Sequence, residues 1–322
     1  MEKRAPVSSG TATFWLIVTT FLWGGSFVFN KIGFRDIPPV TFLFLRFALA
    51  TLFMALFSLK RLRGLDPRII RKGVLVGCAL ASANLSFVMG VSGTSVTRAG
   101  FLNNLFVLIV PLLCYLLWRD KVDRLTGVGI CLATGGLALL AGGTGFSRGD
   151  LFSTVCALFI AIHIITVSKV LKNEDVYLVS LVQFATVTVI GAVLTALLPH
   201  RPITVGTAAA GALLYCAIFP TVICFTLQNT YQRYTTPTRA CLIYTLDPVW
   251  SMLGGYVILG ERLNMWEGLG CLLIFAAVAV PLAIRVVLER RGHKKYDVEE
   301  GMEKRLEEGA PAGQEGLGAP PG

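Results

Sequence analysis

Ten runs of predominantly apolar residues dominate this sequence, and each is about as long as a helix that crosses a lipid bilayer. The runs lie at 13–30, 39–59, 73–91, 97–117, 125–142, 151–168, 176–198, 207–227, 237–259 and 266–288. About 20 apolar residues span the hydrocarbon core as a helix. Only 15% of the chain is charged, against roughly a quarter in soluble proteins. The sequence therefore predicts an all-α, multi-pass membrane protein with ten transmembrane helices, since lipid leaves unpaired backbone groups without partners.

Basic residues are distributed unequally between the connections that join these runs. They are concentrated at Lys60–Lys72, at Arg119–Arg124 and from Arg285 onward, whereas the alternate connections carry one or two each. Basic loops remain on the cytoplasmic side of a membrane. We therefore expect a protein of the cell membrane with both termini in the cytoplasm, which requires an even number of crossings. The +10 charge is explained by these loops, so we expect the lipid bilayer as a partner and no nucleic acid.

Two stretches of the chain match without a gap at an offset of 141 residues. At this offset GTSVTRA (93–99) aligns with YTTPTRA (234–240), Asp120-Lys121-Val122 with Glu261-Arg262-Leu263, and Gly127 and Gly129 with Gly268 and Gly270. Earlier parts match weakly, and only at an offset of 138. The offset contains five spans, an odd number, so the second copy enters the membrane inverted. Inverted repeats are typical of secondary transporters.

The repeat predicts three regions. We expect a first five-helix repeat at 13–143 and a second, inverted repeat at 150–288. Residues 292–322 are rich in Gly, Pro and Glu and poor in large apolar residues. Such a composition does not bury enough surface to offset the entropy of ordering, so we predict a disordered cytoplasmic tail there.

Polar side chains within the apolar runs are the candidate functional residues. A charge at mid-bilayer costs at least about 2.5–3.5 kcal/mol, so such groups tend to face a cavity or a partner. The candidate substrate-binding residues are Trp23, Asn30, Arg46, Asn84, Asn103, His163, Tyr244 and Asp247. No catalytic residue, metal ligand or cofactor is predicted, because P-loop, HExxH, GxSxG and dinucleotide-binding patterns are absent from the sequence.

Asp247 and Pro248 lie side by side in the ninth run. A spacing of three and four residues places Tyr244, Asp247 and Ser251 on one helix face, and the proline removes a backbone donor. Two interpretations remain open. This face is a substrate or proton site in a central cavity, or Asp247 forms a fixed ion pair that holds helices together, with Arg46 as the candidate partner.

The other candidates also allow two interpretations. Arg46 either anchors an anionic group of a substrate or serves structure, extending its stem to the outer interface or pairing with a carboxylate or carbonyls. His163 is either a hydrogen-bonded core residue or a proton carrier. Asn103 and Asn104 point about 100° apart on a helix, so we expect at most one to line a cavity.

Two sequence motifs resemble the EamA family of the drug/metabolite transporter superfamily. LWGGSFV (22–28) followed by LRFALA (45–50) resembles the family's opening, and LDPVWSMLGGYVILGERLNMWEGLG (246–270) resembles its last two spans. The resemblance covers 13–288 and implies a ten-span permease of amino acids, other small metabolites or toxic compounds. It places Trp23, Arg46 and Asp247 in recurring patterns, with Asp247 where a glutamate is common. The first copy departs from the pattern, since Pro111 lies one turn after the position that Pro248 predicts.

The resulting hypothesis is a secondary transporter, not an enzyme. Its substrate is a small organic metabolite such as an amino acid, its direction is export and its mechanism is alternating access. Two alternatives remain. GVSG at 90–93 resembles the motif of intramembrane serine proteases, with Ser92 as nucleophile and His163 as base. A channel is the other, although rings of charge or filter-like loops are not visible in the sequence.

Overall fold

The computed structural model describes most of the chain. It covers residues 9–140, 147–171, 174–198, 203, 205–260, 265–266, 268–270, 272–281, 283–284 and 287. All regular elements in these residues are helices. The predicted tail at 292–322 lies outside the described residues.

The helices follow the predicted apolar runs closely. In the first half they are α1 (Ser9–Gly33), α2 (Pro39–Ser58), the 3-10 helix η1 (Leu59–Gly64), α3 (Pro67–Gly93), α4 (Val96–Asn103), α5 (Phe106–Trp118) and α6 (Arg124–Leu140). In the second half they are α7 (Arg148–Val170), α8 (Val176–Leu197), α9 (Thr207–Ala217), the π-helix η2 (Ile218–Ile223), α10 (Cys224–Tyr231), the 3-10 helix η3 (Gln232–Tyr234), α11 (Pro237–Tyr244) and α12 (Asp247–Leu259). An apolar helix at Gly268–Pro281 follows.

Eight helical stretches among the described residues are long and apolar enough to cross a membrane. Two more apolar helices, Arg124–Leu139 and Gly268–Pro281, are shorter. Large apolar side chains are exposed on many of these helices, for example Leu56, Val193 and Val257. Exposed apolar surface on this scale is typical of a face covered by lipid rather than water. The fold is therefore that of an all-helical protein with several membrane crossings.

The two copies of the internal repeat have matching helix boundaries. At the offset of 141, the bounds of α4 coincide with those of α11, and the bounds of α5 with those of α12. The N-cap side chains correspond as well, because Ser95 accepts from the backbone N–H of Arg98 and Thr236 accepts from that of Arg239. In the first copy the helix is interrupted at Asn104, between α4 and α5, whereas Pro111 lies inside α5 and not at the interruption. A proline next to the break is therefore not required to produce it.

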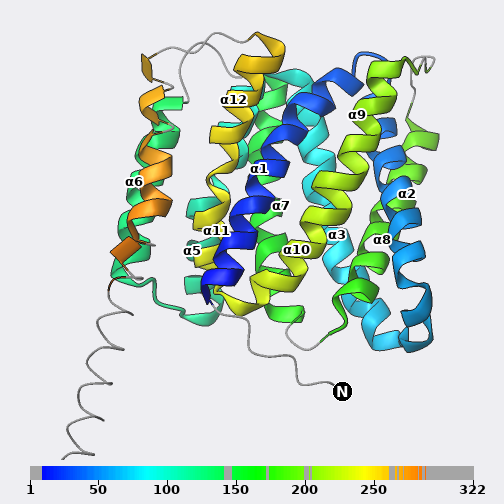
Figure 1. Cartoon of the computed structure of the whole chain (residues 1–322), viewed down its shortest axis with the longest axis horizontal. Helices are drawn as coiled ribbons and strands as arrows, with labels where there is room; N and C mark the ends of the chain where they lie inside the picture. Colours follow the sequence, from blue (N-terminus) through cyan, green and yellow to red (C-terminus); the bar gives the residue numbers. More distant parts are fainter. Residues whose placement is uncertain are drawn as a thin grey trace, which may run out of the picture. The chain divides into compact units, whose positions relative to one another are not determined.

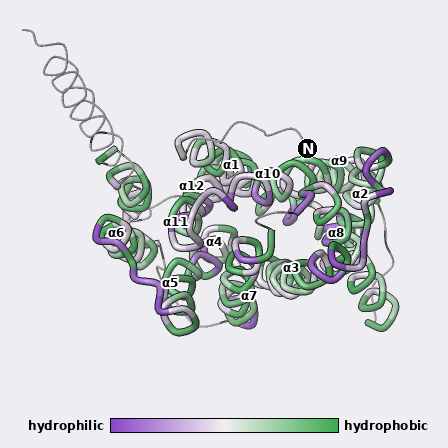
Figure 2. Tube along the Cα trace, turned by 90° about the horizontal axis from the view of Figure 1, so that it is seen from below, coloured by the Kyte–Doolittle hydropathy of each residue, from purple (hydrophilic) through white to green (hydrophobic). Residues whose placement is uncertain are grey.

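The closest packing joins helices of the first half to helices of the second. α3 packs against α7 and α8, α2 against α8, and α1 against α12. Figure 2, which looks along the helices, shows α1 and α10 on one side of the bundle and α3 and α7 on the opposite side. Residues as far as Val278 form one compact unit, and Ala279 begins a second unit. In Figure 1 the labelled helices of the first unit lie roughly parallel. Short breaks separate α4 from α5 and α11 from α12.

Candidate functional site

A cavity lies among the helices of both halves, next to the two helix breaks. Its empty volume is about 700 Å³, a figure that includes the open mouth. Helices α1, α2, α3, α4, α5, α7, α10, α11 and α12 contribute to its wall. Both halves of the chain therefore build this cavity.

Seven of the eight predicted substrate-binding residues line the cavity. They are Trp23, Arg46, Asn84, Asn103, His163, Tyr244 and Asp247. Between them the wall is largely aromatic, with Phe27, Phe87, Phe106 and Phe225. The Trp23 ring lies 5.3 Å from the Tyr244 ring and 5.5 Å from the Phe225 ring, measured between centroids. An apolar wall with a few polar groups is suited to an organic molecule.

Asn30 does not line the cavity. Its amide nitrogen donates to the Ser26 carbonyl at 2.6 Å and lies 3.7 Å from the Cys216 sulfur. Asn30 follows Trp23 by seven residues, which places it on nearly the same face of α1 but about 10 Å farther along the helix axis. The periodicity of the run indicated the correct face, and depth along the helix excludes Asn30 from the cavity wall.

Arg46 is buried within the helix bundle and does not extend to the outer interface. Only 2% of its surface is exposed. Its Nε donates to the Thr221 hydroxyl at 2.6 Å, and its Nη1 has no hydrogen-bond partner among the described residues. No ion pair joins Arg46 to Asp247 in the part of the chain that the structure describes. The fixed ion pair that the sequence left open is therefore absent from this structure.

Asp247 is the first residue of α12, directly after the break. A carboxylate at a helix N-terminus is stabilised by the helix dipole. Its Oδ1 is enclosed and has no described hydrogen-bond partner. The predicted shared face is only partly correct. Ser251 does not line the cavity, because α4 approaches α12 so closely there that a Cβ on Gly100 would lie 2.8 Å from the Ser251 hydroxyl.

Asn103 and Asn104 both line the cavity, contrary to the expectation of at most one. The expectation assumed that one continuous helix contains both residues, but α4 ends at Asn103. Asn104 donates to the Gly100 carbonyl at 2.9 Å, while neither amide atom of Asn103 has a described partner. The helix break thus brings two neighbouring amides to one wall.

His163 belongs to a buried chain of hydrogen bonds. Its Nε2 lies 3.3 Å from the Gln183 amide nitrogen, and the Gln183 oxygen accepts from Asn229 at 2.9 Å. An amide nitrogen only donates, so His163 Nε2 is the acceptor and the ring is neutral in this arrangement. His163 is thus a hydrogen-bonded core residue that also faces the cavity.

Ser92 and His163 do not form a catalytic pair. The Ser92 hydroxyl is exposed and donates to the Met89 carbonyl at 2.9 Å. Ser92 adjoins Gly93, which packs on Gly149 at the start of α7. His163 lies 14 residues beyond Gly149, about 21 Å farther along that helix. This separation contradicts the serine protease hypothesis.

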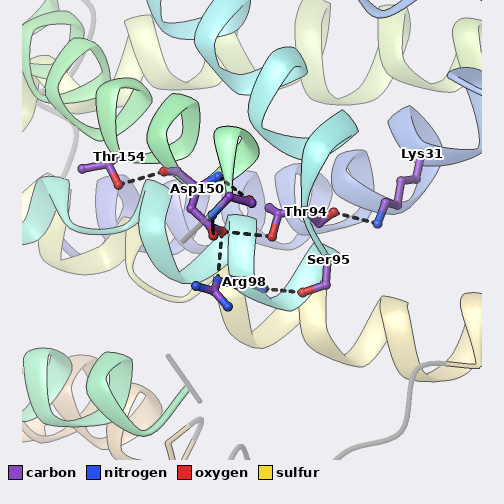
Figure 3. A network of polar contacts seen from close by, with 7 residues as sticks. Lys31, Thr94, Ser95, Arg98, Asp150 and Thr154 are labelled. Atoms are coloured by element: carbon purple, nitrogen blue, oxygen red, sulfur yellow. Dashed lines mark hydrogen bonds and ion pairs between the residues drawn. The ribbon is translucent and has the colours of Figure 1, made fainter. Parts of the chain in front are cut away.

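A second polar cluster ties together the ends of several helices away from the cavity (Figure 3). Asp150 is only 1% exposed, and its Oδ1 accepts from Arg98 at 2.9 Å and from the Thr94 hydroxyl at 3.0 Å. Lys31 donates to the Thr94 carbonyl at 2.8 Å. We refer to Lys31, Thr94, Arg98 and Asp150 as the Asp150 network. It connects α1, α4 and α7, and so joins the two halves of the chain.

The sequence reasoning missed several residues of the site. Gln228 lines the cavity, and its amide nitrogen and the Tyr244 hydroxyl both donate to the Gln232 oxygen, at 2.8 and 3.0 Å. The spacing of four between Gln228 and Gln232, directly after the apolar run at 207–227, was the available signal. Among the described residues, no group of three or more His, Cys, Asp or Glu is placed to hold a metal ion.

The membrane-length helices and the cavity with polar and aromatic walls place the chain in the class of multi-pass membrane proteins that enclose a site for a small molecule. Residues 10–142 and 147–282 match the EamA-like transporter family. The chain belongs to this family. It is a membrane transporter and not an enzyme.

Individual relatives agree with this assignment. An uncharacterized transporter of Archaeoglobus fulgidus is 28% identical over 271 residues, covering 84% of this chain and 85% of that protein. An uncharacterized inner membrane transporter of Escherichia coli (strain K12), YedA, is 25% identical over 283 residues, covering 83% and 89%. A protein crystal structure aligns with a TM-score of 0.70 at 19% identity, over 86% of this chain and 99% of that one. This last likeness concerns the fold alone.

Proposed function

We propose that this protein is a secondary transporter that moves a small organic metabolite, such as an amino acid, through the central cavity by alternating access. The single observation that carries the proposal is the convergence of seven polar or aromatic candidates from both halves on one cavity. The aromatic wall suits an apolar body, while Arg46 and Asp247 suit charged groups of a substrate. Export is the direction we propose.

The proposed topology has ten spans, arranged as two inverted repeats at 13–143 and 150–288. The identical bounds of the two broken helices support it. The two shorter apolar helices, Arg124–Leu139 and Gly268–Pro281, then complete the ten crossings. The basic connections place both termini in the cytoplasm, and the protein in the cell membrane.

Alternating access requires the cavity to open first at one end of the helix bundle and then at the other. The Asp150 network joins the two halves at one end of the bundle through contacts to the buried Asp150. At the corresponding position of the second repeat, Arg239 lies 3.8 Å from Asp123, and both side chains are nearly half exposed. We propose that the halves rock about the cavity so that one end loosens as the other tightens.

Counterflow in proteoliposomes tests this proposal. Vesicles preloaded with an unlabelled mixture of amino acids and related metabolites are diluted into labelled phenylalanine, chosen because the cavity wall is aromatic. A carrier gives saturable uptake that internal substrate accelerates. Ser92→Ala is the matched control and should leave uptake unchanged, since Ser92 does not line the cavity. Non-saturating, current-carrying flux would instead establish a channel.

Direction and topology need separate experiments. Efflux from preloaded cells that exceeds uptake under the same gradient supports export. Reporter tags at each terminus test sidedness. A tag at the N-terminus and one at the C-terminus reporting opposite faces would reject the even number of crossings.

A further inference from the structure

The π-helical segment η2 forms hydrogen bonds with two residues of the cavity wall, Arg46 and Trp23. Pro220 has no backbone N–H, so the carbonyl of Cys216, four residues earlier, lacks its α-helical partner. The Thr221 hydroxyl donates to this carbonyl at 2.6 Å. The only proton of that hydroxyl is therefore used, and its lone pairs are left to accept. Arg46 Nε donates to it, also at 2.6 Å.

The same segment holds Trp23. The backbone N–H of Cys224 donates to the carbonyls of Phe219 and Thr221, and the carbonyl of Pro220 accepts the indole N–H of Trp23 at 3.0 Å. Two adjacent residues of one short π-helix thus orient the guanidinium and the indole that face the cavity. Interruptions of this kind are frequent at functional sites.

The first repeat contains no equivalent of this arrangement. At the offset of 138, Ser82 and Ala83 correspond to Pro220 and Thr221, and α3 runs without interruption through them. At the offset of 138 that aligns the earlier helices, Phe184 corresponds to Arg46. The polar pair therefore occurs in one orientation only, which indicates a site for one particular ligand group rather than a general feature of the repeat.

Arg46 is a buried cation whose charge is not balanced in this structure. Its Nη1 has no hydrogen-bond partner, and none of the ion pairs in the described part of the chain includes it. Its guanidinium carbon also lies 5.4 Å from the Phe47 ring centroid. Burial of an unpaired charge is costly, and a guanidinium whose Nε is already bonded still has further N–H donors for a carboxylate.

We propose that Arg46 is the anion-binding group of the cavity and that Thr221 is its positioning residue. The ligand group is a carboxylate on a compact, apolar or aromatic body, which rests against Trp23 and its neighbours. This inference deepens the proposed function and rests on it for the statement that the bound molecule is a transported one. The binding itself is a separate property, and is measured on its own.

Binding to the purified, full-length protein tests the assignment with two matched probes. Phenylacetate and phenylacetamide share their ring and shape and differ in charge. We measure their dissociation constants from thermal stabilisation and from changes in Trp fluorescence, because Trp23 lies in the cavity wall. The wild-type protein should bind phenylacetate at least about tenfold more tightly, the size expected for a charge-assisted hydrogen bond.

Four variants distinguish loss of the hydrogen bond that positions Arg46 from a general effect on folding. The preference for the carboxylate is the dissociation constant of phenylacetamide divided by that of phenylacetate, and in Arg46→Gln this ratio should fall to about one. Thr221→Val keeps the shape and removes the hydroxyl, so the preference should fall about threefold or more, while phenylacetamide binding stays unchanged. Thr221→Ser keeps the hydroxyl and should restore the preference. Thr230→Val is the matched control, because that hydroxyl donates only within α10, to the Thr226 carbonyl.

Specific outcomes overturn the proposal. These are equal affinity for both probes in the wild type, no binding of phenylacetate at millimolar concentration, or a preference that persists in Arg46→Gln or Thr221→Val. Carboxylate binding that depends on Arg46 without any flux in vesicles would contradict only the transport proposal. Flux of a metabolite that is indifferent to both variants would contradict only this inference.

Discussion

The two broken helices, α4–α5 and α11–α12, share their backbone and differ in their chemistry. Both begin at a hydroxyl N-cap, both break after eight residues, and both end at a left-handed residue, Arg119 or Gly260. Around the break, however, the first repeat has Asn103 and Phe106 where the second has Tyr244 and Asp247. The repeat thus preserves the position of the break, while each copy places different groups in the cavity.

The outer ends of the same two helices differ even more. Arg98 contacts the buried Asp150 at 2.9 Å, whereas its counterpart Arg239 lies 3.8 Å from an exposed Asp123. Desolvated, hydrogen-bonded charges are tightly coupled, and exposed pairs contribute little. Among the described residues, the α4 end thus carries an ion pair to a buried carboxylate and the α11 end an exposed ion pair, and the following predictions test this asymmetry.

The largest expected effect concerns the chemistry at the two breaks. If Asp247 carries a proton during transport, Asp247→Asn should abolish pH-driven flux in proteoliposomes, by about a hundredfold or more, and leave substrate exchange intact. The amide keeps the shape but does not bind and release a proton at physiological pH. Phe106→Leu, at the matching position of the first repeat, should leave the pH dependence unaltered. A variant Asp247→Asn that retains pH-driven flux would reject the coupling role.

The second-largest expected effect concerns the ion pairs at the outer ends of α4 and α11. Asp150→Ala removes the acceptor of Arg98 and Thr94 and the capping box with Ser147. It should lower the free energy of unfolding by about 4 kcal/mol. Asp123→Ala removes an exposed pair and a helix cap at Thr126, and should cost about 1 kcal/mol. Denaturant unfolding in detergent measures both, and equal losses would contradict the asymmetry.

A third effect concerns the close contact between Gly93 and Gly149, next to the Asp150 network. A Cβ on Gly149 would collide with the backbone of Gly93, whereas one on Gly211 in α9 meets no atom within 4 Å. Gly149→Ala should destabilise the protein by about 2 kcal/mol, because the obstacle is backbone. Gly211→Ala should be neutral or slightly stabilising, by up to about 1 kcal/mol. Thermal melts of both variants provide the comparison.

The smallest expected effect concerns the N-caps of α4 and α11, and it should be equal in the two repeats. Ser95→Ala and Thr236→Ala each remove one N-cap hydrogen bond. Each should cost about 1 kcal/mol in unfolding free energy. Losses that differ by more than about 1 kcal/mol would show that the two caps are not equivalent.

Much of the fold could be predicted from local properties of the chain. The length of the apolar runs identified the membrane-length helices, and the offset of 141 aligned the two broken helices. The candidate list was also largely placed on one cavity, because polar groups in lipid-length helices tend to face the interior. Predictions from helical spacing alone were less reliable: Asn104 joined the cavity wall because α4 ends before it, and Ser251 did not because α4 packs against it.

What the sequence by itself determined is the helical membrane class, the repeat and the identity of the polar groups available at depth. These follow from hydrophobic length and helical period, which are local properties. Only the tertiary structure decided which of those groups meet. Arg46 and Thr221 are 175 residues apart in the chain and 2.6 Å apart in space. Such a contact depends on how two helices pack and on the π-helix that turns Thr221 inward, and neither is encoded in the period of one segment.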